Sequence, residues 1–159
     1  DLGLLNYTTV IDYAAANNKE LENFYPAFKA VKDYVVQAPE KTTGWYLPSI
    51  GQWYDFTANL GGLPSWDDAI NEGNDLTPNL YRWSNQTELV SKINAYFEPL
   101  GTGNYDAIPN GSYQKFFSSS TYSDSGIWTW FVGKQANVVQ CWHNVRYNSD
   151  SAVRPILAF

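Results

Sequence analysis

The sequence predicts an α+β domain in which helices come first and strands last. Apolar residues recur at helical spacing before Gly101, whereas after Gly101 they come in short runs between Gly, Asn, Ser, Thr and Tyr. No βαβ alternation, dinucleotide-binding glycine pattern or P-loop is visible. A length of 159 residues suits a single domain. We therefore expect one domain over residues 1–159, and interpret it as the C-terminal domain of a longer protein.

The first helix is expected around residues 8–16. Thr8 or Thr9 can act as its N-cap, and Asn17-Asn18 would end it. The apolar residues in between recur at helical spacing: Val10, Ile11, Tyr13 and Ala14.

A second helix is expected over Leu21–Val36. Pro26 is tolerated in the first turn of a helix, and Pro39 with the polar residues 40–43 would end it. One face carries an apolar stripe at positions i, i+4, i+7 and i+11: Phe24, Phe28, Val31 and Val35.

Capping patterns predict two more helices. Ser49 and Gln52 have the spacing of a capping box, and Gly61-Gly62 supplies a left-handed end. The buried side of this helix would carry Ile50, Trp53, Phe56 or Thr57, and Leu60.

Asn85 and Glu88 repeat the cap spacing before a short helix that ends at Pro99 and Gly101. Its apolar face would carry Leu89, Ile93, Tyr96 and Leu100. Strands are expected at 127–132 and 137–141.

Charge and composition exclude several classes of protein. Ten basic residues against sixteen acidic ones give a net charge of −6, and no basic run could neutralise successive phosphates, so nucleic acid is not an expected partner. The chain has no stretch of about 18 apolar residues, and we expect no direct membrane insertion by this segment. Cys141 is the only cysteine, which excludes an internal disulfide and a Cys-based zinc site.

Aromatic residues are unusually frequent: 7 Trp, 12 Tyr and 8 Phe make up 17% of the chain. Rigid rings with a polar group are typical of binding surfaces. A small core built from rings would have the same composition. Composition leaves both interpretations open, so the positions of the rings along the chain must distinguish a binding surface from a core.

Five short motifs occur in an order that resembles one family. They are Gly44–Trp53, Leu60–Gly62, Ser118–Tyr122, Ile127-Trp128 with Phe131 and Gly133, and Val153–Phe159. The family is the C-type-lectin-like domains of bacterial surface and phage-associated proteins, related to formylglycine-generating enzymes and common in gut Bacteroidales. The resemblance covers residues 44–159. It implies two helices, a small twisted antiparallel sheet and long irregular loops.

The resemblance also suggests a hypothesis about sequence variation. The family includes variable proteins of diversity-generating retroelements, in which adenine positions of a C-terminal segment are rewritten to give a hypervariable binding surface. Between Ser123 and Ala152 this chain carries many residues that a mutagenised Asn codon can reach. Gln140 and Trp142 are not reachable from such a codon and would be template residues. Val153–Phe159 would be the constant tail.

Catalysis is not expected. His143 lies two residues after Cys141, but nucleophilic catalysis also needs an orienting group and an oxyanion site, which a sequence alone does not show. The related formylglycine-generating enzymes use a pair of cysteines, and this chain has one. We therefore expect a non-enzyme with no catalytic residue.

No cofactor is expected, with a structural calcium ion as the alternative. An acidic cluster could supply oxygen ligands, although its spacing is not that of an EF-hand and a solvated loop is the simpler interpretation: Asp67, Asp68, Glu72 and Asp75. The calcium-dependent sugar motifs of C-type lectins are represented only by Glu98-Pro99-Leu100 and Trp142-His143-Asn144, so that sugar site is not expected.

The C-terminal third contains the expected ligand-contacting residues, in which rings alternate with adaptable polar groups. They are Trp130, Trp142, His143, Asn144, Arg146, Tyr147, Asn148 and Asp150. Trp128 and Phe131 are assigned to the core, and Arg154 is expected to anchor the last segment on a carboxylate or carbonyl group.

These observations predict a non-enzymatic ligand-binding module, an adhesin or receptor-binding domain. Its ligand would be a protein or glycan on another cell or phage, and its place the cell surface, the extracellular space or a phage particle. A structural packing domain of a fimbria or phage tail is the main alternative, and a degenerate enzyme of the formylglycine-generating type is a weaker one.

Overall fold

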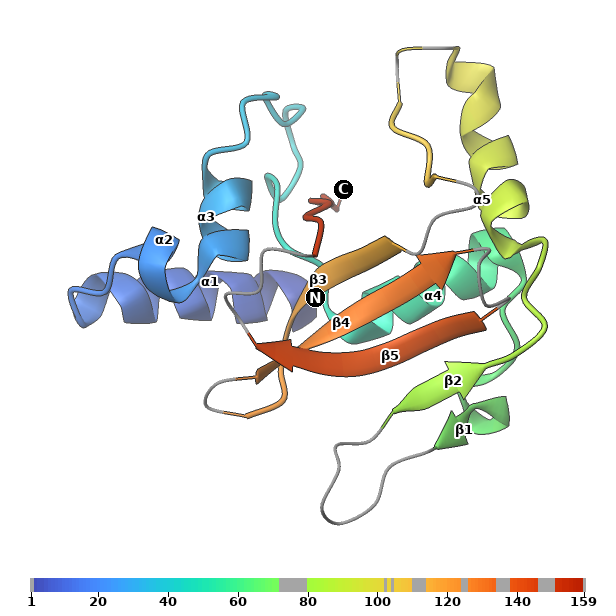
Figure 1. The fold of residues 1–159 in the computed structure, drawn as a ribbon. Helices are drawn as coiled ribbons and strands as arrows, with labels where there is room; N and C mark the ends of the chain where they lie inside the picture. The colour runs from blue at the N-terminus through green and yellow to red at the C-terminus, as the bar shows by residue number, and fades with distance from the viewer. Residues whose placement is uncertain are drawn as a thin grey trace.

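The structure is a computed structural model that describes residues 2–71, 80–101, 103, 105–109, 114–123, 126–133, 138–145 and 151–158. These residues form five α-helices and a five-stranded antiparallel sheet (Figure 1), which confirms the predicted α+β class. The helices are α1 (Leu2–Ala16), α2 (Leu21–Phe24), α3 (Pro26–Lys32), α4 (Ile50–Gly61) and α5 (Leu89–Phe97), with 3₁₀ turns η1 (Trp66–Asp68) and η2 (Glu98–Leu100). The strands are β1 (Ile70–Asn71), β2 (Tyr81–Trp83), β3 (Gln114–Thr121), β4 (Gly126–Gly133) and β5 (Val138–Val145). None of these helices is long and apolar enough to cross a bilayer.

Helix α1 begins six residues before the expected cap. Thr8 lies inside the helix, where its hydroxyl donates to the carbonyls of Leu4 and Leu5 at 3.1 Å each. The prediction of an N-cap at Thr8 or Thr9 is therefore wrong. The expected end is confirmed, because the helix stops at Ala16 and Asn18 has a positive φ of 51°.

The second predicted helix is divided and shorter than expected. Tyr25 has φ −144° and ψ 58° and separates α2 from α3, because the ring of Pro26 disfavours helical geometry in the residue before it. The chain leaves the helix after Lys32, and Val35 is 93% exposed. Of the predicted stripe, Phe28 and Val31 are buried.

Helix α4 follows its sequence signals. The Ser49 Oγ accepts from the Gln52 backbone N–H at 3.2 Å, and the Gln52 Oε1 accepts from the Ser49 N–H at 2.9 Å, which completes the capping box. Gly62 adopts the left-handed conformation, with φ 72°, just after the helix. Trp53 and Thr57 are buried as predicted.

The predicted helix after Asn85 is confirmed as α5, but Asn85 is not its N-cap. Asn85 has φ 62° and lies before the helix, whose N-cap is Glu88 with no side-chain hydrogen bond. Leu89 and Ile93 are buried, but Tyr96 and Leu100 are 61% and 55% exposed, so the predicted apolar face is correct only in its first half.

The sheet has the order β1-β2-β5-β4-β3, so β5 is its central strand. β4 and β5 confirm the two expected strands, and β5 extends to Val145. The expectation that all strands follow all helices is wrong, because β1 and β2 precede α5. These strands are two and three residues long, too short for a period-2 pattern to stand out.

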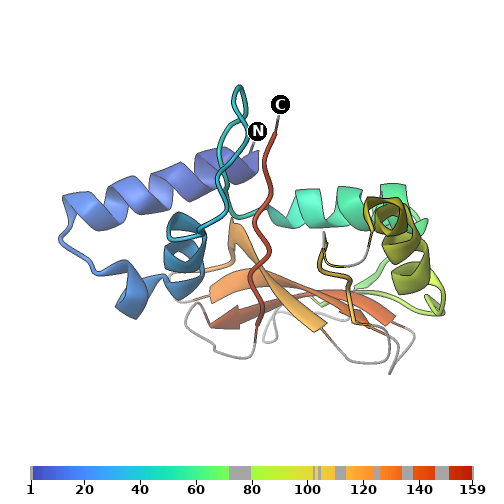
Figure 2. The same ribbon diagram turned by 90° about the horizontal axis from the view of Figure 1, so that it is seen from above.

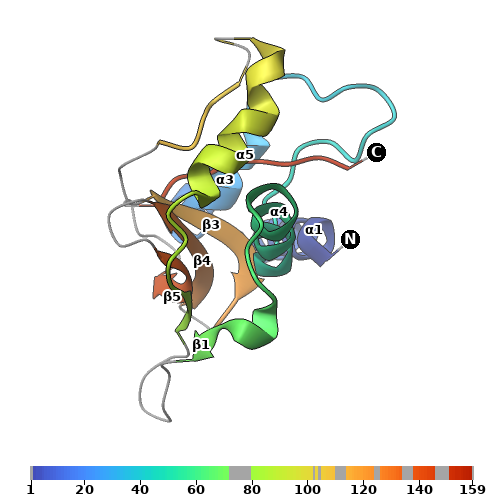
Figure 3. The same cartoon turned by 90° about the vertical axis from the view of Figure 1, so that its right-hand side faces the viewer.

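Two hydrophobic clusters join the helices to the sheet. In the larger, residues of α4 and α5 pack on β2, β3, β4 and β5, and it contains Trp53, Leu89, Ile93, Trp83, Phe116, Trp130, Val139 and Cys141. In the smaller, α1 and α3 pack with Tyr46, Leu47, Phe117 and Ile127. Figures 2 and 3 show α1 and α4 on the same side of the sheet.

A C-terminal segment, residues 151–158, runs along the smaller cluster, against which Val153 and Ile156 pack. The Ala152 N–H donates to the Lys115 carbonyl at 2.7 Å, and its carbonyl accepts from Phe117 at 3.0 Å. Ile156 then exchanges two backbone hydrogen bonds with Tyr46, at 2.9 and 3.0 Å. The segment therefore connects β3 to the chain that leads into α4.

Candidate functional site

The two faces of β5 determine which predicted residues can act together. Side chains alternate between faces along a strand, and paired residues of neighbouring strands share a face. Cys141 pairs with Trp130 and His143 with Trp128, on the face that packs against α4 and α5. Trp142 pairs with Thr129 and therefore lies on the opposite face.

Trp142 is the exposed aromatic residue of this strand. Its side chain is 44% exposed, and its ring centroid lies 6.2 Å from that of Phe131. Phe131 is itself only 2% exposed, and the Lys115 amino group lies 5.6 Å from its ring. Thr129 is completely buried and donates to the Trp142 carbonyl at 2.8 Å. Trp142 is thus an exposed ring on a rigid support.

Trp130 does not belong to this surface. It is 0% exposed and packs between Phe116 and Cys141 in the ladder, with its ring 5.7 Å from that of Trp83. The expectation that Trp130 contacts a ligand is therefore wrong, because the sheet directs this ring into the main core. The assignment of Phe131 to packing is confirmed by its burial, and Trp128 packs against the same core as Trp130.

His143 lies on the helix-facing side of the sheet, and its ring also meets that of Trp142 edge-on, with centroids 6.0 Å apart. Its imidazole stacks on Tyr122 with centroids 4.5 Å apart and an interplanar angle of 26°. Tyr122 in turn meets Trp128 edge-on at 5.2 Å. Desolvation by this packing lowers the pKa of His143. The prediction of contact residues omitted Tyr122, although it ends the Ser118–Tyr122 motif and is 41% exposed.

The other predicted contacts are only partly placed. The backbone of Asn144 pairs with Ile127 in the β4–β5 ladder. Arg146, Tyr147, Asn148 and Asp150 lie outside the described residues, as do Glu72 and Asp75 of the acidic cluster.

Cys141 and the acidic cluster offer little chemistry in the described structure. Burial raises the pKa of the Cys141 thiol, so at neutral pH it is protonated in the core beside Trp130. Asp67 and Asp68 lie exposed in η1. Among the described residues, no three His, Cys, Asp or Glu side chains gather in a way that could hold a metal ion.

Arg154 anchors the C-terminal segment as predicted. Its guanidinium donates to the backbone carbonyl of Asp106. Burial lowers the pKa of Arg154, while the negative charge of Asp106 acts in the opposite direction.

Three comparisons with known proteins give no match for this chain: no protein-family model, no curated protein and no solved structure matches it.

Proposed function

We propose that the chain is a non-enzymatic ligand-binding module with a C-type-lectin-like fold, which binds a protein or glycan on another cell or phage. The observation that carries the proposal is Trp142, a 44% exposed ring held on the buried Phe131. Tryptophan is among the residue types most enriched at binding hot spots. A ring already fixed by the scaffold loses little conformational entropy on binding.

The family assignment is supported by how its motifs meet in space. The first and last motifs of the resemblance, Gly44–Trp53 and Val153–Phe159, are joined by the paired hydrogen bonds of Tyr46 and Ile156. Ser118–Thr121 and Ile127–Gly133 lie on the paired strands β3 and β4, and Tyr122 follows β3 directly. The motifs are distant in sequence but adjacent in the structure. This arrangement supports one shared family pattern over several independent sequence matches.

The hypervariable surface remains part of this proposal. β5 is held on both sides by β2 and β4, with eight residue pairs to β4 alone. Exposed side chains on such a backbone can usually change with stability effects within about 0.5 kcal/mol. A diversified surface beside a constant Trp142 would therefore be compatible with a constant fold. We place such a domain on a cell surface or phage particle.

The binding test compares the wild type with Trp142→Ala on identical arrays of glycans and of bacterial surface proteins. We expect saturable binding by the wild type and at least tenfold weaker binding by the variant, since truncating a hot-spot residue removes about 2 kcal/mol or more. Tyr96→Ala removes a 61% exposed ring from α5 and serves as the matched control. Equal affinities for wild type and Trp142→Ala would contradict the proposal.

The diversification test is sequencing of the source locus. We expect a reverse-transcriptase gene and an imperfect repeat of the codons for residues 118–159, with mismatches at template adenines. The mismatched codons would then identify the binding residues. A locus with neither feature removes the hypervariability hypothesis and leaves an ordinary binding domain.

A second candidate, a packing domain of a fimbria or phage tail, is favoured by exposed apolar residues on α1. Leu2 and Leu5 are 71% and 60% exposed. Such side chains are stabilised when a neighbouring chain covers them. Concentration-dependent association in sedimentation experiments, abolished by Leu5→Glu and retained in Trp142→Ala, would favour this candidate over ligand recognition by β5.

A further inference from the structure

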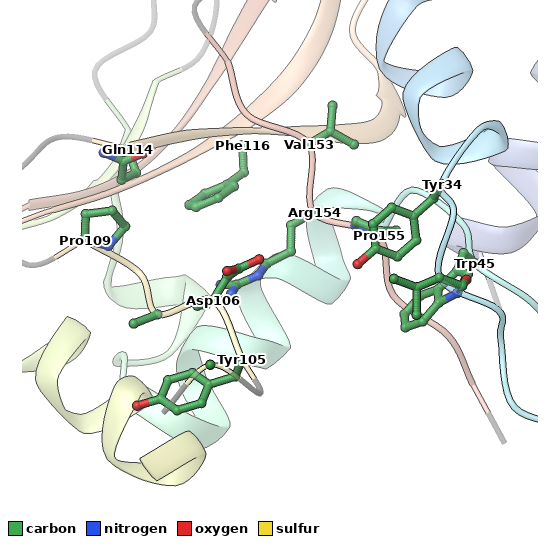
Figure 4. Close-up of a pocket in the computed structure, with 13 residues that line it drawn as sticks. Tyr34, Trp45, Tyr105, Asp106, Pro109, Gln114, Phe116, Val153, Arg154 and Pro155 are labelled. Carbon is green, nitrogen blue, oxygen red and sulfur yellow. Dashed lines mark hydrogen bonds between the residues drawn. The ribbon is translucent and has the colours of Figure 1, made fainter. Parts of the chain in front are cut away.

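A second concave site lies away from Trp142, where three distant segments meet. Its walls are the chain after α3 with Tyr34 and Trp45, the chain before β3 with Tyr105 and Asp106, and the C-terminal segment with Arg154. Phe116 and Gln114 of β3 also line it (Figure 4). Its volume of about 620 Å³ falls within the range of small-molecule sites.

Fixed aromatic rings form two opposite parts of this cleft. Tyr34 is 42% exposed and meets Trp45 edge-on, with centroids 5.3 Å apart. The Trp45 indole donates from Nε1 to the Val36 carbonyl at 2.7 Å, which holds the ring in place. Tyr105 stacks on Phe97 of α5 at 5.8 Å. The rings are therefore positioned before any ligand arrives, which reduces the entropy lost on binding.

Polar groups of opposite charge occupy the space between the rings. Figure 4 shows the side chains of Arg154 and Asp106 extending toward one another between Tyr105 and Tyr34. One guanidinium nitrogen is already committed to the Asp106 carbonyl, but a guanidinium has five N–H donors. Arg154, Asp106 and the Gln114 amide thus offer donors and acceptors without an excess of either charge.

We propose that this cleft binds a neutral pyranose sugar, as a free glycoside or as a residue of a glycan. A pyranose ring has apolar C–H faces that can pack on aromatic rings, and hydroxyl groups that both donate and accept hydrogen bonds. A purely apolar ligand would remove Arg154 and Asp106 from water without offering them new hydrogen bonds, which is unfavourable. A charged sugar would meet Arg154 and Asp106 together, one of like and one of opposite charge, so its charge gains no net attraction. The site shares no residue with the Trp142 surface, so this inference is independent of the proposed function.

The test is titration of the chain, by calorimetry and by ligand-observed NMR, with defined sugars. The panel contains the methyl pyranosides of glucose, galactose, mannose and N-acetylglucosamine, with methyl glucuronide as the charged comparison. We expect saturable binding of at least one neutral glycoside and weaker binding of the glucuronide.

Variants locate the bound sugar. Tyr34→Ala and Asp106→Asn should each weaken binding about tenfold or more, the size of effect that loss of a central contact has. Tyr122→Ala is the matched control, because Tyr122 has nearly the same exposure, 41% against 42%, and does not line the cleft. Both Tyr34 and Asp106 are exposed, and thermal melting verifies that the variants fold.

Three results would overturn the proposal. They are no saturable binding by any neutral glycoside of the panel, unchanged affinity in both Tyr34→Ala and Asp106→Asn, or tighter binding of the glucuronide. Sugar binding that is lost in Trp142→Ala and retained in Tyr34→Ala would place the sugar on β5, which rejects the cleft and supports the proposed function. Binding lost in Tyr34→Ala and retained in Trp142→Ala supports the cleft alone.

Discussion

Trp130 and Trp142 lie on paired strands and have opposite roles in stability. Trp130 is 0% exposed and Trp142 44% exposed. We expect Trp130→Ala to lower the free energy of unfolding by about 3–5 kcal/mol, because it opens a large cavity in the main core. Trp142→Ala should lower it by less than about 1 kcal/mol. Urea denaturation of both variants measures the difference, and similar losses would mean that Trp142 is a core residue.

His143 gives the chain a defined pH response. Its pKa is lowered by burial beneath the ordinary value of 6.5, so between the two values the unfolded chain binds more protons than the folded one. The contribution of His143 to the free energy of unfolding is therefore fully present above pH 6.5 and falls as the pH drops toward the folded pKa. Since His143 is the only histidine, its NMR titration is unambiguous.

The His143→Gln variant is the control for this response. We expect it to lose the part of the pH dependence that lies just below pH 6.5, while the acid response of the carboxylates remains. A native titration midpoint at or above 6.5 would contradict the prediction.

The position of the candidate site could be predicted only to the level of a strand. The density of rings and polar groups in the C-terminal third led to β5, and β5 carries the exposed Trp142. The face of each residue could not be predicted, because Thr129 and Phe131 are as buried as Trp130 and Val132 on the other face. With both faces of β4 buried, no polar alternation distinguishes them.

At the scale of single elements, the capping box of α4 is the clearest local feature that stabilises a helix. Ser49→Ala removes the acceptor of the Gln52 N–H and leaves that donor unsatisfied at a site where Ser49 is only 7% exposed. We expect a loss of about 0.5–2 kcal/mol in the free energy of unfolding. Ser84→Ala, at an exposed serine outside the helices, should change it by no more than about 0.5 kcal/mol. Chemical denaturation compares the two, and equal effects would show that the cap contributes nothing.

Elements with local signals could be predicted, and those set by distant contacts could not. Ser49, Gln52 and Gly62 mark α4 through bonds among near neighbours. By contrast, the first turn of α1 lies against the start of α4: a Cβ on Gly3 would lie 2.9 Å from the backbone nitrogen of Ser49, the N-cap of α4. A close approach of two helices leaves no signature in the sequence of either one.

At the scale of the whole molecule, the C-terminal segment holds together parts of the smaller hydrophobic cluster that lie far apart in sequence. Its bonds to Lys115, Phe117 and Tyr46 link β3 to the chain before α4. We expect a variant truncated after Ser151 to melt at a lower temperature than the full chain, because Tyr46 and Phe117 would keep unpaired backbone groups. Circular dichroism and calorimetry measure the transition. A truncated chain with one sharp transition at the original temperature would contradict this.

The hydrogen bonds between the C-terminal segment and the chain before α4 have a consequence during protein synthesis. The Ala158 N–H donates to the Thr43 hydroxyl across 115 positions of sequence, at 2.9 Å. Contacts of such high contact order form late and slow the folding of a domain. On the ribosome, the nascent chain up to Ser151 therefore presents the edge of β3 and the stretch around Tyr46 without their partners. In that interval we expect the incomplete domain to be most prone to aggregation, since exposed strand edges are the surfaces through which incomplete domains associate.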